Sequence, residues 1–145
     1  MIQRIQSVFL LLSGIALFSL FGLPFATSTV AIPDLFSDLV YNIQDSPILM
    51  ILTVLGGVLS LISIFLFKNR GLQARMSYMV SVFSILLLLT SFLLVFNECT
   101  TDAGAESISE SIGIAMPVLS LIFSLFAAKF INKDEATVSS MNRLR

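Results

Sequence analysis

The sequence predicts an all-α integral membrane protein, a four-helix bundle of transmembrane helices in up-down order with both termini in the cytoplasm. Two observations lead to this class: an excess of apolar residues and a one-sided distribution of basic residues. The 145-residue chain is 57% hydrophobic and 12% charged, with a mean hydropathy of +0.99, whereas soluble domains are about 45–50% apolar and about 25% charged. A single domain of this size needs a bilayer as the apolar phase for so many apolar side chains.

Four apolar stretches approach the length of about 20 residues that a helix needs to cross a hydrocarbon core about 30 Å thick. We place the spans at residues 5–25, 47–67, 76–96 and 112–131, followed by a cytoplasmic tail at 132–145. Pro24 ends the first stretch, and Ser46 before Pro47 is typical of an N-cap followed by proline at the first helical position. The first stretch exceeds the core of about 7–15 residues found in signal peptides, so we expect an uncleaved anchor.

The basic residues predict the orientation, because Lys and Arg remain in the cytoplasm. All eight fall on one side of the four predicted spans: Arg4, Lys68, Arg70, Arg75, Lys129, Lys133, Arg143 and Arg145. The loops on the other side, 26–46 and 97–111, contain no basic residue and hold seven of the nine acidic residues. Within the first of these loops, apolar residues at helical spacing predict a short amphipathic helix at the outer interface, with a simple loop as the alternative. The residues of its apolar face are Leu35, Phe36, Leu39 and Val40.

The composition argues against most kinds of chemistry. With no His and a single Cys, Cys99, the chain has no intramolecular disulfide, His/Cys metal site or dithiol redox centre. The four spans contain no ionisable residue in their interiors, which argues against proton-coupled transport and carboxylate-based hydrolysis. Serine without a neighbouring base is inert as a nucleophile. We therefore expect no catalytic residue, no cofactor and no metal, and the net charge of −1 gives no reason to expect a nucleic-acid partner.

Small residues at spacings of three and four form a stripe on one face of three spans. In lipid, such residues allow close helix approach and interhelical hydrogen bonds, so we expect them at helix contacts; a narrow polar pore is the alternative. The predicted packing residues are Gly56, Ser60, Ser63, Ser77, Ser81, Ser84, Ser91, Gly113, Ser120 and Ser124. The first span has a weaker set, Ala16, Ser19 and Gly22. We expect lipid or peripheral contacts for Phe65, Phe83, Leu87 and Phe123.

The tail is the most distinctive polar segment. Its acids precede its arginines, as a helix dipole favours, and Val138, Met141 and Leu144 can form a small apolar stripe. The tail is either a helix end in water or on anionic lipid, or a docking element for a cytoplasmic partner. The residues predicted for docking are Lys133, Asp134, Glu135, Val138, Met141, Arg143, Leu144 and Arg145.

Three segments together resemble a known family. They are residues 1–6 (MIQRIQ), residues 65–70 (FLFKNR) with Gln73, and the closing KDE at 133–135 followed by Ser140 and RLR at 143–145. Over its whole length the chain resembles the uncharacterised membrane family named domain of unknown function 4293, found in Bacteroidota. Asn142 and Thr137 depart from its pattern, where an acid and a larger apolar residue are expected. The resemblance implies a small four-span protein of the inner membrane, with no known activity or catalytic residue.

These observations favour a non-enzymatic accessory, assembly or scaffold subunit of a larger complex in the cytoplasmic (inner) membrane. The reason is that the spans lack ionisable residues while the two termini carry defined polar motifs. A small channel or facilitator lined by the serine-rich faces is the alternative, and a membrane enzyme is a third and weaker hypothesis.

Overall fold

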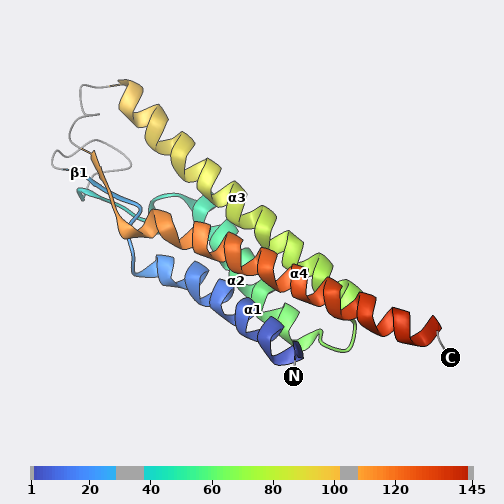
Figure 1. The fold of residues 1–145 in the computed structure, drawn as a ribbon. Coiled ribbons are helices and arrows are strands. Elements are labelled where there is room, and N and C mark those ends of the chain that lie inside the picture. The colour runs from blue at the N-terminus through green and yellow to red at the C-terminus, as the bar shows by residue number, and fades with distance from the viewer. Residues whose placement is uncertain (1, 29–37, 102–107, 144–145) are drawn as a thin grey trace.

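Four helices packed side by side make up most of the computed structural model, which describes residues 2–28, 38–101 and 108–143 (Figure 1). Helix α1, Ile2–Phe18, continues as the 3-10 helix η1, Ser19–Phe21. Helices α2, α3 and α4 are Pro47–Phe65, Arg70–Thr101 and Ala115–Arg143. Each helix packs against the next in sequence, and α4 closes against α1. Both chain ends lie at the same end of the molecule (Figure 1).

Three of these helices are long and apolar enough to cross a membrane: Pro47–Phe65, Arg70–Asn97 and Ile112–Ser140. The first apolar helix is shorter, Ile5–Phe21. It therefore ends before residue 25, where the sequence predicts its end. The helix ends there because the turn at Gly22 is followed by Pro24, which has no N–H to donate, and Phe25 leads into a strand. Pro117 is tolerated because it lies in the first turn of α4, where an N–H would have no intrahelical acceptor.

The end opposite the termini carries a small β-sheet, so the all-α prediction is incomplete. Strands β1 (Ala26–Ser28), β2 (Val40–Tyr41) and β3 (Ile108–Glu110) pair antiparallel in the order β2-β1-β3. Thr27 lies opposite Val40 on one side and Ser109 on the other. The amphipathic helix predicted around Leu35, Phe36, Leu39 and Val40 is wrong at its described end, where a turn at Asp38–Leu39 leads into β2; Leu35 and Phe36 lie outside the described residues.

Apolar side chains pack beneath this sheet and close the end of the helices. Phe25, Tyr41 and Ile43 are buried in one cluster with Leu17 and Leu20, and the rings of Phe25 and Tyr41 are 5.5 Å apart. Burial raises the pKa of Tyr41 and the nearby negative charge of Asp45 raises it further, so the phenol stays neutral. Two 3-10 helices, η2 (Ile43–Asp45) and η4 (Ile112–Ile114), lead from the sheet into α2 and α4.

A tight turn joins α2 to α3 at the end that holds the termini. The amide of Leu66 donates to the carbonyl of Ser63 at 3.3 Å, and the amide of Asn69 donates to the carbonyl of Leu66 at 2.9 Å. The side-chain Oδ1 of Asn69 then accepts the amide of Leu72 at 3.3 Å and so caps the start of α3. This short connection makes α2 and α3 an antiparallel pair.

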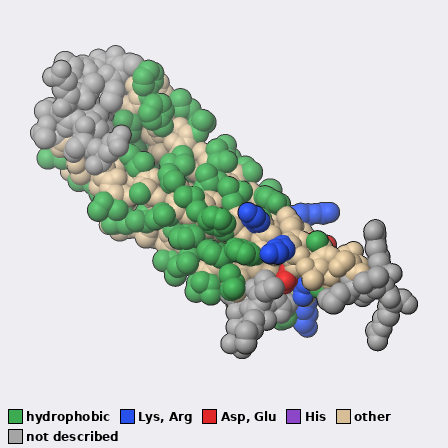
Figure 2. Space-filling model, in the orientation of Figure 1, with side chains coloured by type: hydrophobic (Ala, Val, Ile, Leu, Met, Phe, Trp, Pro, Cys, Tyr) green, Lys and Arg blue, Asp and Glu red, His purple; other side chains and the backbone are tan. Residues whose placement is uncertain are grey.

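The helices are apolar outside and rich in serine inside, the reverse of a soluble protein. Figure 2 shows hydrophobic side chains covering the long middle of the molecule and charged ones gathered at one end. Phe65 is 77% exposed, as expected, and Phe83 and Phe123 are half-buried. The prediction for Leu87 is wrong, because it is fully buried. The buried positions of α3 include 84, 87 and 91, which are three and four residues apart. This spacing places Leu87 on the buried face of the helix and position 88 at the edge of that face.

Candidate functional site

The predicted serine faces meet inside the molecule, and one hydroxyl joins three helices. The Oγ of Ser120 on α4 lies 2.8 Å from the Oγ of Ser13 on α1 and accepts a hydrogen bond from the Oγ of Ser84 on α3 at 3.1 Å. All three side chains are completely buried. Hydroxyl groups buried in apolar surroundings need hydrogen-bond partners from the protein, because no water is available there to bond them.

A second layer of serines lies one turn further along α4, toward the C-terminus. The Oγ of Ser81 lies 2.8 Å from the Oγ of Ser124, and the Oγ of Ser77 donates to the carbonyl of Ser124 at 2.7 Å. On the other side of the bundle, the Oγ of Ser60 on α2 donates to the carbonyl of Leu10 on α1 at 2.6 Å. These bonds tie α3 to α4 and α1 to α2.

The other predicted packing residues have different surroundings. Ser63 donates to the carbonyl of Gln73 across the α2–α3 turn at 3.3 Å, whereas Ser91 donates within α3, to the carbonyl of Leu88 at 2.9 Å. Gly56 is buried, and a Cβ there would lie 3.0 Å from Cδ1 of Leu17 on α1. A small residue is therefore needed at position 56 for α1 to approach α2 this closely.

Gly113 contacts a loop backbone, and it lies before α4 begins. It belongs to the 3-10 helix η4, and its amide donates to the carbonyl of Pro24 at 3.0 Å. A Cβ at this position would lie 2.1 Å from that same carbonyl oxygen, a separation that real atoms do not adopt. The absence of a side chain at Gly113 thus allows the segment before α4 to rest on the loop that follows η1.

The sequence reasoning missed the residues of α1 that take part in these contacts. Ser13 is the partner of Ser120, and Gln6 is buried and donates its Nε2 to the carbonyl of Phe130 at 3.1 Å. Their spacing was a usable signal, since positions 6, 10, 13 and 17 follow one helical face and all are buried. The weaker set chosen instead includes Gly22, which is exposed beyond the helix end.

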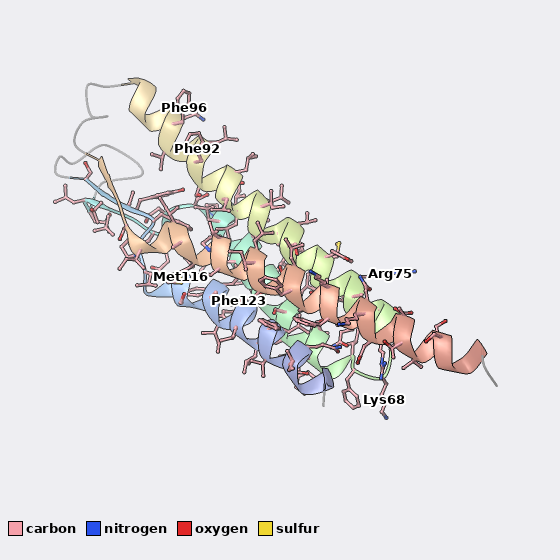
Figure 3. The ribbon with its side chains drawn as sticks, in the orientation of Figure 1. Lys68, Arg75, Phe92, Phe96, Met116 and Phe123 are labelled. Atoms are coloured by element: carbon pink, nitrogen blue, oxygen red, sulfur yellow. The ribbon has the colours of Figure 1, made fainter. Side chains whose placement is uncertain are left out.

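Basic side chains form the second polar feature, at the end of the molecule that holds the termini. We call this the basic end; its described cations are Lys68, Arg70, Arg75, Lys129 and Lys133. Figure 3 shows Lys68 and Arg75 projecting from this end, while Phe92 and Phe96 lie far along α3 near the opposite end. The charges therefore lie beyond one edge of the apolar surface and do not interrupt it.

A shallow depression of about 680 Å³ opens at the basic end between the α2–α3 turn and α4. Arg70 holds the two sides together: its Nη1 lies 3.6 Å from Oδ2 of Asp134 and donates to the carbonyl of Asp134 at 3.4 Å. The residues that line the depression are Lys68, Asn69, Arg70, Gly71, Glu135, Val138 and Ser139. The sequence reasoning missed those from the turn and Ser139, because only the folded chain brings positions near 70 and 135 together.

The predicted docking residues of the tail divide into four groups. Lys133, Glu135 and Val138 are exposed on α4, and Asp134 is held by Arg70. Met141 and Arg143 belong to α4, but their side chains are outside what the structure describes. Leu144 and Arg145 lie outside the described residues. Helix α4 continues without a break through the predicted tail segment as far as residue 143.

The polar groups offer hydrogen bonds and ion pairs but no recognisable catalytic arrangement. Among the side chains that the structure describes, no three potential metal ligands come together. The described interior serines bond one another or main-chain carbonyls, and none is next to a histidine, since the chain has none. Chemically, the interior can hold helices together, and the depression at the basic end can bind a charged group.

Comparison with protein families identifies one match, and it covers nearly all of the chain. The family described as "Domain of unknown function (DUF4293)" matches residues 2–144. No curated protein and no solved structure matches the chain. Since the match extends over both the serine-rich helices and the basic end, the chain belongs to the DUF4293 family.

Proposed function

We propose that this protein crosses the cytoplasmic membrane four times, with both termini in the cytoplasm, and serves as a non-enzymatic accessory, assembly or scaffold subunit of a larger membrane complex. One observation carries this proposal: the serine hydroxyls inside the bundle bond one another across the helices, while the basic side chains that the structure describes are gathered at the basic end, where a partner can reach them. The hydrogen bonds of the interior therefore serve to hold the helices together.

The apolar outer faces support insertion of all four helices, including the short first one. The helical path from Ile2 to Phe21 rises about 30 Å at 1.5 Å per residue, close to the hydrocarbon thickness. Its outward residues include Ile5, Val8 and Ile15, each about half exposed. Because α1 lies between α2 and α4, which are long apolar helices, it must share their surroundings.

The hydrogen bonds of the serines favour a packing role over the alternative of a serine-lined channel. A water-filled pore would need hydroxyl groups turned toward the water column. Here Ser84 and Ser120 bond each other, and Ser81 and Ser124 do the same, across the α3–α4 contact. Interhelical bonds of this kind stabilise helix association in lipid and need no water.

The projecting end of α4 is the surface that we assign to a partner. It extends past the other helices (Figure 1), and its contact with the α2–α3 turn through Arg70 and Asp134 gives it a fixed direction. Val138, 40% exposed, offers an apolar contact beside the charges of Lys133 and Glu135. An amphipathic helix that lays its apolar face into a hydrophobic groove is a common form of docking element.

The test is affinity purification from the native membrane in mild detergent, followed by mass spectrometry. We compare the full chain with a variant in which residues 136–145 are replaced by a Gly/Ser segment of equal length, which keeps chain length and insertion unchanged. We expect a stoichiometric partner with the full chain and its loss with the variant. Equal recovery at equal expression would contradict the docking role, and a homo-oligomer that conducts ions in liposomes would favour the channel.

A further inference from the structure

The depression at the basic end contains two charges that are unmatched within the described residues. Arg70 is paired with Asp134, so its charge is already balanced. Lys68 and Glu135, which also line the depression, form no ion pair with any side chain that the structure describes. One cation and one carboxylate therefore face the same open space from opposite sides, Lys68 from the turn and Glu135 from α4.

The carboxylate of Glu135 lies over the start of α3, within the depression. A Cβ built on Gly71 would lie 3.6 Å from Oε1 of Glu135 and 4.0 Å from Oδ1 of Asn69. Donors are present beside it: the guanidinium of Arg70 has five N–H groups, only some of which reach Asp134, and Asn69 and Ser139 add an amide and a hydroxyl. The volume, about 680 Å³, falls within the range of about 300–1,000 Å³ typical of ligand sites.

Exposed apolar side chains that adjoin the lining residues in sequence point to an amphiphilic ligand. Phe65 and Phe67, directly before Lys68 in sequence, are 77% and 49% exposed, and Leu72 on the first turn of α3 is 39% exposed. In a membrane-inserted chain these side chains stand at the level where acyl chains meet headgroups. A ligand with its polar part in the depression would thus have its apolar part beside Phe65 and Phe67.

From these contacts we infer that the depression binds the headgroup of phosphatidylethanolamine from the cytoplasmic leaflet. Lys68 and the free N–H groups of Arg70 bind the phosphate, and Glu135 accepts hydrogen bonds from the ammonium group. Phosphatidylglycerol lacks the cation that Glu135 requires, and the quaternary nitrogen of phosphatidylcholine has no N–H to donate. The inference rests on the membrane insertion proposed above but not on any protein partner, so either can fail without the other.

The experiment uses the purified full chain in detergent with added phosphatidylethanolamine, phosphatidylglycerol or phosphatidylcholine carrying identical acyl chains. Native mass spectrometry measures retained lipid, and the midpoint of thermal unfolding measures stabilisation. We expect greater retention and a larger midpoint shift with phosphatidylethanolamine. Lys68→Gln and Glu135→Gln should each reduce its retention by roughly two- to fivefold, the factor for one partly exposed charge contact. Lys133→Gln, an exposed cation on α4 outside the depression, is the matched control.

The two variants also test the phosphate and the ammonium group of the headgroup separately. Lys68→Gln should weaken phosphatidylethanolamine and phosphatidylglycerol alike, whereas Glu135→Gln should remove the preference between them. Equal retention of the three lipids by the unmodified chain, or equal losses in Lys133→Gln and Glu135→Gln, would overturn the assignment. Soluble phosphoethanolamine that stabilises the chain as much as the lipid does would also overturn it, since the ligand would then be a free metabolite. Carbonate extraction of membranes tests insertion separately.

Discussion

At the scale of single residues, Gly22, which follows η1, and Gly113, which lies in η4, differ in what surrounds them. A Cβ on Gly113 would overlap the carbonyl oxygen of Pro24, whereas a Cβ on Gly22 would have only the carbonyl oxygen of Ser19 at 3.9 Å. We expect Gly113→Ala to lower the free energy of unfolding by about 1–3 kcal/mol, because backbone must move to admit the methyl group. Gly22→Ala is the control and should change it little. Thermal unfolding in detergent measures both, and equal midpoints would contradict the close contact.

Ser120 gives a second prediction at this scale, because its hydroxyl is shared by α1, α3 and α4. Ser120→Ala removes its bonds to Ser13 and Ser84. Interhelical hydrogen bonds in membranes contribute about 0.6 kcal/mol on average and up to about 1.7, so we expect a loss of about 1–2 kcal/mol. Ser91→Ala, which removes a bond within α3 only, should cost less. Chemical unfolding in mixed micelles compares the two, and a larger effect at Ser91 would exclude Ser120 as the main link.

At the scale of secondary structure, the helices were predictable and the sheet was not. A long apolar run bounded by Pro47 or by the basic turn before α3 identifies a helix from local sequence alone. The strands have two or three residues each, too few to show a period of two, and β1 pairs with segments far from it in sequence. The depression at the basic end depends in the same way on a long-range contact, between Arg70 and Asp134.

The contact of α2 with its neighbours gives the prediction for this scale. A side chain at Gly56 would meet Cδ1 of Leu17 on α1 at 3.0 Å and Cβ of Phe83 on α3 at 3.4 Å. Gly56→Leu should therefore push α1 and α3 away from α2 and destabilise the fold by about 1–3 kcal/mol. Val58→Leu, on the exposed side of the same helix, is the matched control. The midpoint of thermal unfolding checks both, and similar values would place position 56 outside the helix contacts.

At the scale of the whole molecule, charge and sheet lie at opposite ends of an apolar body. The termini, the α2–α3 turn and the described basic side chains are at one end, and the sheet with Asp38 and Asp45 is at the other. A membrane across the apolar middle would separate these two ends. Since lysine and arginine are retained in the cytoplasm during insertion, the basic end should be cytoplasmic and the sheet should lie outside.

Two single cysteines at opposite ends test this orientation in a Cys99→Ser background. Gln44→Cys lies in the exposed 3-10 helix η2 at the sheet end, and Leu72→Cys lies on the partly exposed first turn of α3 at the basic end. An impermeant maleimide added to spheroplasts should label position 44 and not position 72, and permeabilisation should make position 72 reactive. Labelling of the two positions from opposite sides would also show that α2, the helix between them, crosses the membrane. Labelling of position 72 from outside would reverse the orientation, and labelling of both positions before permeabilisation would exclude α2 as a span.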